Sequence, residues 1–334
     1  MLMVFGVLLV RAEQPGDTRG MNVNVDNFVR AETDRMFADI QRDAGGINTF
    51  RHNREPASID QQTVIRLNRD TLYSFAIVDI SAGPVLTLPD SGERYLSAMI
   101  VNQDHLINAV YHDAGTYRLT VDQFETPYVL VGVRILVNPL EEGDLTEVAQ
   151  LQDALKLESG SATPFVYPDY DRASMDATRD ALLTLAKGLR AFDHTFGARN
   201  QIEPIRHLIG TAAGWGGLPT DEATYIGVDP TPSRDTRTLT LQDVPVDGFW
   251  SVSVYNARGF FEPNERNQYT VNSVTGVKNP DGSVTVRFDP NGSGDKPNTI
   301  VTPEGWNFLV RLYRPRAAII DGTWQLPELT PATD

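Results

Sequence analysis

The sequence has 334 residues, enough to bury two hydrophobic cores, and its 41% hydrophobic and 22% charged residues are ordinary for a globular protein. A formal net charge of −15 at pH 7 argues against nucleic acid and anionic membranes as partners, because both are bound by basic surfaces. The sequence contains no cysteine, which excludes disulfides, thiolate nucleophiles and cysteine-based metal centres.

The first ten residues are apolar, but they are too few to span a bilayer, and they carry neither a basic flank nor a small-residue cleavage site. Three origins fit this stretch: the tail of a truncated signal peptide, a misplaced start codon and a short strand. Cytoplasmic and exported locations therefore both stay open.

The first predicted element is a helix that begins after Asp26, carries apolar residues at helical spacing from Phe28 to Ile40, and ends at Gly45-Gly46. From the segment 66–80 to Asn138, short β-rich segments alternate with turn clusters. That spacing predicts a β-sandwich or a barrel.

The middle of the chain is predicted to be helical. Three leucines and Val148 recur at helical spacing over 145–155, and leucines and phenylalanines do so again over 182–196, with a loop at 159–171 between them. A third, short helix opens at Pro204 and ends at Gly214. The β pattern then returns over 238–239, 249–255, 268–274, 283–288 and 306–314.

The stretch 247–264 is the most informative part of the second β-rich block. Its residues alternate from Trp250 to Tyr255, which predicts a half-buried strand with Trp250, Val252 and Val254 toward a core and Ser251, Ser253 and Tyr255 on an available face. Polar and aromatic residues gather where this strand ends. They are Asn256, Arg258, Phe260, Phe261 and Asn264.

The two β-rich blocks resemble each other at a steady offset of about 150 residues, which predicts two copies of one β unit. The matched positions are 86–90 with 239–243, Tyr73 with Tyr225, Tyr95 with Phe249, Ser97 with Ser251, Asn102 with Asn256, and Tyr117 with Tyr269. The copies differ in the loops 102–105 and 256–259. We expect these two unlike loop tips to meet over a common cavity.

These residues also carry a family resemblance. Over 64–73, 102–105, 206–217, 247–256 and 305–315, the chain resembles the paired bacterial domains of unknown function numbered 1254 (amino-terminal) and 1214 (carboxy-terminal). The resemblance implies a two-domain, mostly β protein with a jelly-roll-like carboxy-terminal half, and it implies no agreed reaction or catalytic residues. Relatives carry a cysteine pair between Phe288 and Trp306 that this chain lacks.

We therefore predict a mainly β fold with a helical insert, made of two related β-sandwich or jelly-roll-like domains. The predicted parts are an N-terminal segment (1–22), an N-terminal β domain (23–140), a helical connection (141–217) and a C-terminal jelly-roll-like β domain (218–334).

Two histidines are candidate acid-base catalysts. His105 follows Asp104, and a carboxylate beside an imidazole can orient a general base or, with His112 and Asp113, form a metal site. His207 is predicted on a short helix near Trp215. The alternative is that these histidines cap elements, pack in a core or lie in turns, and we predict no metal and no cofactor.

Arg258 is the leading candidate for ligand binding, because a guanidinium beside aromatic rings suits a carboxylate, a sugar or a planar ring. The other candidate substrate-binding residues are Asn102, Trp215, Tyr255, Asn256 and Asn264. A second polar group either binds a ligand or holds the domain seam through a buried Arg–Asp pair. It consists of Asn68, Arg69, Asp70 and Tyr73.

The sequence shows no local signature of an α/β-hydrolase, a P-loop enzyme, a Rossmann dehydrogenase or a zincin. The leading hypothesis is a small-molecule enzyme, a hydrolase or isomerase, with a pocket near the interface of the two β domains. The alternative is a non-catalytic sandwich that binds carbohydrate or a protein partner. The expected partners are a small or sugar-like molecule and further copies of the chain, but neither nucleic acid nor a membrane.

Overall fold

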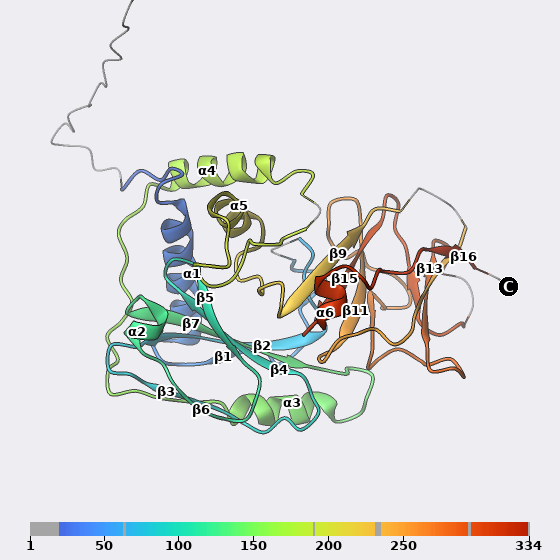
Figure 1. The fold of residues 1–334 in the computed structure, drawn as a ribbon, viewed down its shortest axis with the longest axis horizontal. Helices are drawn as coiled ribbons and strands as arrows, with labels where there is room; N and C mark the ends of the chain where they lie inside the picture. Colours follow the sequence, from blue (N-terminus) through green and yellow to red (C-terminus); the bar gives the residue numbers. More distant parts are fainter. Residues whose placement is uncertain (1–19, 63–64, 190, 231–234, 293–294, 333–334) are drawn as a thin grey trace, which may run out of the picture.

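The computed structural model describes residues 20–62, 65–189, 191–230, 235–292 and 295–332. The chain forms two β-rich halves side by side, with a group of helices over the first half (Figure 1). The prediction for the N-terminal segment falls almost wholly outside the described residues. Within those ranges, no helix combines the length and the apolar character needed to cross a bilayer.

The first half is a sandwich of two antiparallel sheets. The larger sheet has the order β1-β2-β7-β4-β5, and the smaller has the order β6-β3-β8. Buried aliphatic residues from Leu72 to Leu155 fill the space between them. The strands are β1 (Arg51–His52), β2 (Thr71–Asp79), β3 (Val85–Leu88), β4 (Leu96–Asn102), β5 (Ile107–Tyr111), β6 (Gly115–Arg118), β7 (Tyr128–Leu136) and β8 (Lys156–Glu158).

The second half is also a two-sheet sandwich. Its sheets have the orders β12-β11-β15-β9 and β14-β13-β10-β16, and its core includes Trp250, Val252 and Val254, as the alternation predicted. The strands are β9 (Ala223–Val228), β10 (Arg237–Leu241), β11 (Trp250–Tyr255), β12 (Thr270–Asn272), β13 (Val284–Asp289), β14 (Thr299–Val301), β15 (Asn307–Tyr313) and β16 (Thr330–Pro331).

The two sandwiches share one topology. The order β2-β7-β4-β5 in the first corresponds to β9-β15-β11-β12 in the second, and β6-β3-β8 corresponds to β13-β10-β16. The registers agree as well: Tyr73 faces Arg134 across β2 and β7, as Tyr225 faces Arg311 across β9 and β15. The predicted mainly β fold of two related sandwich domains is thus confirmed, with open sheets rather than closed barrels.

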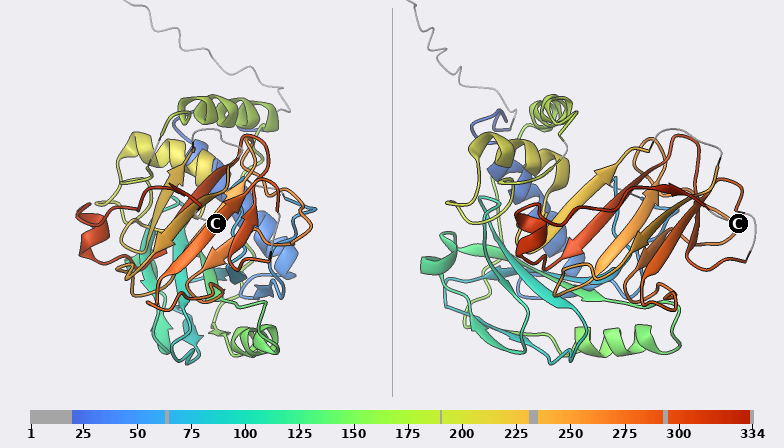
Figure 2. Two further views of the ribbon diagram at one scale, coloured as in Figure 1. Left: turned by 90° about the vertical axis from the view of Figure 1, so that its right-hand side faces the viewer. Right: turned by 45° about the vertical axis from the view of Figure 1, so that its right-hand side comes forward.

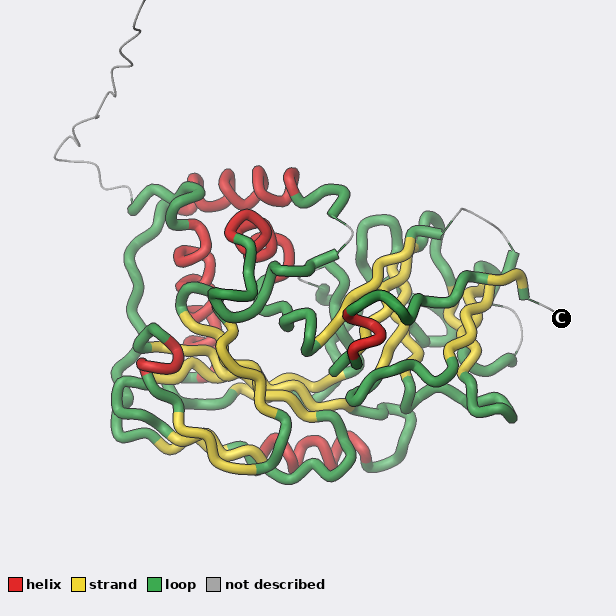
Figure 3. The backbone as a smooth tube through the Cα atoms, in the orientation of Figure 1, coloured by secondary structure: helices red, strands yellow, loops and turns green. Residues whose placement is uncertain are grey.

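Three helices form a separate layer on the first sandwich, as Figures 2 and 3 show. They share a small apolar core that includes Phe28, Ala31 and Leu182. The helices are α1 (Phe28–Ala44), α4 (Arg172–Leu185) and α5 (Pro204–Gly214). Short helices α2 (Val121–Phe124) and α6 (Ala317–Ile320) lie in loops, and α3 (Asp144–Asp153) packs Val148 into the first sandwich core.

The second predicted helix is shorter than its leucine and phenylalanine spacing suggested. α4 ends at Leu185, and Gly188 follows with a left-handed φ of 88°, a conformation that stops a helix. Phe192 and Phe196 therefore lie beyond it and pack in a core on the outer face of the larger first sheet. The first sandwich extends to Glu158, since β8 pairs with β3.

The two sandwiches meet along a buried seam between the sheet faces that point away from their own cores. Tyr95 packs edge-on against Phe249 at a centroid distance of 5.1 Å, and Phe249 stacks on Tyr313 at 4.2 Å. The prediction of an available face on β11 is wrong, because Ser251 and Ser253 are both fully buried there. Alternation identified the face correctly, but the other domain covers it.

Candidate functional site

The two loop tips that follow β4 and β11 have the same backbone design. The Asn102 Oδ1 accepts the N–H groups of Asp104 and Leu106, both at 2.9 Å. The Asn256 Oδ1 accepts the corresponding N–H groups of Arg258 and Phe260, at 3.0 and 3.2 Å. These asparagines fix both loops by the side-chain bonding that makes asparagine frequent in turns.

The left-handed position in these loops is occupied by His105 in the first copy and by Gly259 in the second, with φ of 58° and 85°. Glycine adopts this conformation without strain, whereas histidine needs compensation from its surroundings. The compensation for His105 is a set of contacts with α5 and the residues that follow it.

His105 is fully buried, and both of its ring nitrogens have partners. The Gly216 N–H donates to Nε2 at 2.9 Å, which leaves the proton of a neutral ring on Nδ1. Nδ1 then donates to the Thr211 hydroxyl at 2.9 Å, and that hydroxyl donates to the His207 carbonyl. Burial and the neighbouring His207 lower the pKa of His105 well below its ordinary value, in keeping with a neutral ring.

His207 lies beside His105, with ring centroids 5.3 Å apart, and it too is held on both sides. Its Nδ1 faces the Thr195 carbonyl and its Nε2 faces the Asp104 carbonyl, each at 3.0 Å. Carbonyl oxygens only accept, so the ring is the donor in any hydrogen bond on either side. Trp215 also stacks on His105, with ring centroids 5.3 Å apart.

The structure thus brings the three predicted catalytic residues together, but without a free acid-base group. All four imidazole nitrogens of His105 and His207 are engaged, and the Asp104 carboxylate binds the Arg30 guanidinium rather than an imidazole. Their acid-base role stays a prediction, and the contacts favour the structural alternative.

Metal-ligand geometry is absent from the described part of the chain, where no three His, Asp or Glu side chains form a group able to hold an ion. His112, which we considered as a ligand, instead bonds to Glu222 at 2.7 Å and so links the first sandwich to the residues that lead into β9.

Arg258 lies in a different part of the structure, in an open hollow of about 560 Å³ at the edge of the seam. Its guanidinium is 5.9 Å from the Phe260 ring centroid. Residues of both halves line the hollow: Ile59, Asp60, Gln62, Asn256, Arg258, Phe260, Phe261, Glu262 and Pro263. No residue of the first loop tip is among them, so the contacts do not support the common cavity that we expected.

Gln62 and Phe261 hold the two walls of this hollow together. The Phe261 N–H donates to the Gln62 side-chain oxygen at 2.8 Å, and the Gln62 amide donates back to the Phe261 carbonyl at 2.9 Å. A further backbone bond joins Arg66 N–H to the Gly259 carbonyl at 2.7 Å. The hollow is therefore built on fixed backbone rather than on one free loop.

The remaining predicted binding residues are used within the protein. Tyr255 is buried, and its hydroxyl donates to the Leu67 carbonyl at 2.9 Å. The Asn264 amide bonds to the backbone of Gln268, and the Trp215 indole N–H donates to Thr33. Their substrate-binding roles stay predictions.

The polar group 68–73 lies at the seam, but among the described residues the Arg69–Asp70 ion pair of that alternative does not form. Asp70 accepts from Thr270 and Asn272 of the second sandwich at 3.1 and 3.0 Å. The Asn68 amide faces the hydroxyls of Thr71, Tyr73 and Tyr313 at 3.0 to 3.1 Å. Arg69 bonds to the Ala57 carbonyl and lies over the Tyr269 ring.

Two seam arginines, Arg134 and Arg311, were missed by the sequence reasoning. They are 8% and 3% exposed and occupy equivalent positions on β7 and β15. A charged residue inside an apolar strand, in the similar segments 133–136 and 310–313, was the available signal, because arginine is seldom buried without a partner.

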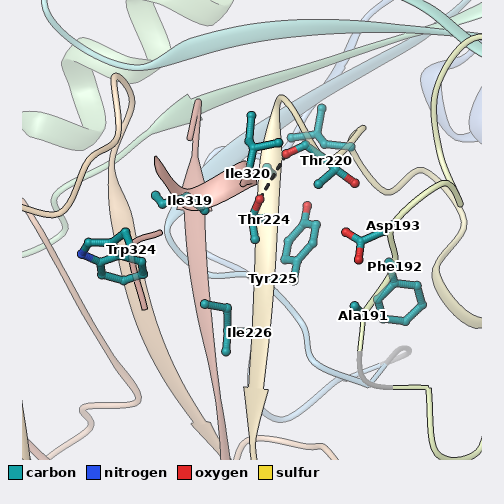
Figure 4. A pocket seen from close by; sticks show the side chains of 12 residues that line it. Ala191, Phe192, Asp193, Thr220, Thr224, Tyr225, Ile226, Ile319, Ile320 and Trp324 are labelled. Atoms are coloured by element: carbon teal, nitrogen blue, oxygen red, sulfur yellow. Dashed lines mark hydrogen bonds between the residues drawn. The ribbon is translucent and has the colours of Figure 1, made fainter. Parts of the chain in front are cut away.

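A second hollow of about 320 Å³ lies beside edge strand β9 (Figure 4). Its lining mixes apolar side chains, such as Phe192, Ile226 and Trp324, with polar ones, such as Asp193 and Thr224. Tyr225 lines it as well and also belongs to the seam, where its phenol is near Arg134.

The fold and these sites define a protein of two duplicated β-sandwiches joined by a helical layer, with a polar seam between them. Family models match both halves: residues 47–159 match a protein of unknown function, DUF1254, and residues 229–317 match a protein of unknown function, DUF1214. The chain belongs to the proteins that carry this pair of domains in this order, as the resemblance implied. A comparison with curated proteins gave no match.

Two solved structures share the fold. The VPA0106 protein from Vibrio parahaemolyticus is 18% identical with a TM-score of 0.68, covering 93% of this chain and 100% of its own. An uncharacterized protein from Burkholderia cenocepacia is 15% identical with a TM-score of 0.55, covering 96% of this chain and 92% of its own. At these identities the likeness concerns the fold alone.

Proposed function

We propose that the protein binds a small, sugar-like molecule with an acidic group in the hollow that contains Arg258. The observation that carries the proposal is the set of side chains around this hollow. A guanidinium, an aromatic ring and the carboxylates of Asp60 and Glu262 line one space between the two halves. Such a mixture matches a ligand that offers hydroxyl donors, one anionic group and an apolar ring face.

Arg258 is suited to the anionic group of that ligand. Its side chain is exposed, and the described residues show it over Phe260 with no carboxylate pairing it. Asn256 fixes the backbone of Arg258 and Phe260 through its Oδ1, so the anchor and the ring keep a set relation. Such preorganisation lowers the entropy lost on binding.

The test compares glucuronate with glucose by saturation-transfer NMR and calorimetry on the full chain. We expect glucuronate to bind more tightly, and Arg258→Met to remove that difference by a loss of about tenfold or more in affinity, equivalent to a charged hydrogen bond. Phe260→Ala should weaken both sugars. Arg118→Met is the matched control, because Arg118 is an exposed arginine on β6 in the outer sheet of the first sandwich.

Two results would contradict the proposal. One is the absence of sugar binding up to about 10 mM, a range that reaches millimolar dissociation constants. The other is glucuronate binding that survives unchanged in Arg258→Met. We do not extend the proposal to hydrolysis or isomerisation, because His105 and His207 lie outside this hollow with their nitrogens engaged.

A further inference from the structure

Arg134 is a buried cation balanced by an aromatic ring rather than by an anion: its guanidinium lies over the Tyr73 ring, 5.5 Å from the centroid. Its Nη2 donates to the Gly216 carbonyl at 2.9 Å, and its Nη1 is 3.9 Å from the Met99 sulfur. The ionisable groups that act most strongly on it are all phenols, those of Tyr73, Tyr225, Tyr95 and Tyr313. Among the described residues no carboxylate forms an ion pair with it, although buried charges are usually paired.

The equivalent arginine of the second copy shows what a satisfied guanidinium looks like in this position. Arg311 donates to the Ser253 hydroxyl at 2.9 Å, the Arg66 carbonyl at 2.7 Å and the Tyr255 hydroxyl at 2.8 Å. The charge of Asp70 also acts on it. The two arginines occupy the same strand position, but Arg311 has several hydrogen-bond acceptors and Arg134 has few.

Two hydroxyl groups lie near Arg134 without bonding to it. Ser97 lies directly across from Arg134 on β4, and neither its Oγ nor the Tyr95 hydroxyl makes a hydrogen bond to the guanidinium. The two hydroxyls are instead neighbours that act on each other. A hydroxyl donates as well as accepts, so both can donate to an anion beside Arg134.

We propose that Arg134 anchors a second binding site, in the seam, for the carboxylate group of a small organic acid. A planar carboxylate accepts two parallel N–H bonds from a guanidinium and still accepts from hydroxyls such as those of Tyr95 and Ser97. A single charge matches a single guanidinium, whereas a phosphate dianion would leave one buried charge unbalanced. The apolar part of the acid packs against the tyrosines around Arg134, which include Tyr73 and Tyr225.

The residues around Arg134 are not all fully buried. Tyr73, Tyr225 and Asn68 are partly exposed, although they lie between the two sandwiches. Tyr225 is shared by the seam and the hollow beside β9. Benzoate is a suitable probe, because its carboxylate matches the guanidinium and its flat ring matches the surrounding tyrosines.

The experiment measures benzoate binding to the full chain by calorimetry and by the shift in Tm, with benzyl alcohol as the uncharged probe. We expect benzoate, but not benzyl alcohol, to raise the Tm in proportion to the logarithm of its concentration once the site is occupied. Arg134→Met should weaken benzoate binding by about tenfold or more. Arg258→Met should leave it unchanged, which separates this site from the sugar-like hollow.

Arg134→Lys covers the case in which Arg134→Met fails to fold. It keeps the charge but not the planar fork, so benzoate binding should persist at reduced affinity. Tyr95→Phe removes one hydroxyl and should weaken binding severalfold without abolishing it. The proposal is overturned by equal benzoate affinity in the wild type and Arg134→Met, by a loss confined to Arg258→Met, or by no binding up to about 10 mM.

The competing explanation is that an ionised side chain of the protein itself balances the charge of Arg134, and this can be measured separately. Burial raises the pKa of the Tyr73 phenol, whereas Arg134 and the donors around its oxygen lower it, and the net pKa lies below the ordinary value. A tyrosinate absorbs at a longer wavelength than a neutral tyrosine, so it would add a red-shifted band to the near-ultraviolet spectrum at neutral pH. If the wild type shows that absorbance and Tyr73→Phe lacks it, the balancing anion belongs to the protein and the carboxylate site is refuted.

Discussion

Arg134 and Arg311 occupy the same place in the two copies of the β unit. Each lies between a tyrosine on one neighbouring strand and a serine on the other, Tyr73 and Ser97 for Arg134 and Tyr225 and Ser251 for Arg311. Duplication placed both arginines on the outer sheet faces, and the packing of these faces buried both. The two copies differ in the acceptors they offer: Arg311 has three close acceptors, whereas Arg134 has the Gly216 carbonyl.

The two arginines should therefore differ in what they contribute to stability. Arg311→Met is expected to lower the free energy of unfolding by about 4 kcal/mol, because it leaves Asp70 and several acceptors buried without their cation. Arg134→Met should change it by about 1 kcal/mol or less, because a poorly balanced buried charge is replaced by an apolar chain of similar size. Urea unfolding measures both, and equal losses would show that Arg134 is as well satisfied as Arg311.

Asp70 is expected to hold the seam through both its hydrogen bonds and its charge. Asp70→Ala should cost about 3 kcal/mol, because Thr270 and Asn272 lose their acceptor and Arg311 loses a nearby anion. Asp70→Asn keeps an acceptor oxygen and removes only the charge, so it should cost less. Equilibrium unfolding in urea compares the two. If Asp70→Asn is as stable as the wild type, the neutral acceptors alone satisfy Arg311.

His105 should make the protein less stable in mild acid. Its folded pKa is lowered by burial and by His207, so below the unfolded value of about 6.5 the unfolded chain binds a proton that the folded chain does not. Stability is then constant above this pH and falls below it, by up to about 1.4 kcal/mol per pH unit for one group.

His105→Asn isolates this effect, because asparagine tolerates the left-handed backbone of that position. The difference in unfolding free energy between the wild type and the variant should shrink as the pH falls from about 6.5 to about 5. Other titrating groups are common to both proteins and cancel in the difference. A difference that stays constant over this range would contradict a neutral buried His105.

Gly259 should be required both for its backbone and for its close contact with the first half. A Cβ at this position, where φ is 85°, would lie 3.2 Å from the Ile65 Cβ. Gly282 has a similar φ of 84° and open space around it, so Gly282→Ala measures the conformational cost alone, about 1 kcal/mol. Gly259→Ala should cost more in thermal or urea unfolding. Equal losses of unfolding free energy in the two variants would mean that the segment around Ile65 moves to make room for the added Cβ.

The sequence predicted the strands and the duplication because both are local patterns. Alternation from Trp250 to Tyr255 and the repeated spacing of Tyr73 and Tyr225 need no knowledge of the tertiary fold. What covers the outer sheet face is not a local property, so the burial of Ser253 and Arg311 could not be read from the alternation.

The candidate site was predicted in part for the same reason. Asp104, His105 and His207 do gather, but the roles of the rings depend on distant backbone groups such as Gly216 N–H and the Thr195 carbonyl. Arg258 and Asn256 were found because they are neighbours in sequence. Arg134 was not found, because its charge within an apolar strand was the only local signal, and its shortage of acceptors shows only in comparison with Arg311.

The two turn asparagines offer a last comparison, because they make the same bonds at different depths. Asn102 is fully buried and also donates to the Phe124 carbonyl at 3.0 Å, whereas Asn256 is partly exposed and its amide faces Glu262 at 3.3 Å. Asn102→Ala leaves buried N–H groups and a carbonyl unpaired, so it should lower the free energy of unfolding by about 3 kcal/mol. Asn256→Ala should lower it by about 1 kcal/mol, because water can partly replace the lost bonds. Urea unfolding of the two variants measures the difference, and an equal loss would mean that burial does not set the value of this turn.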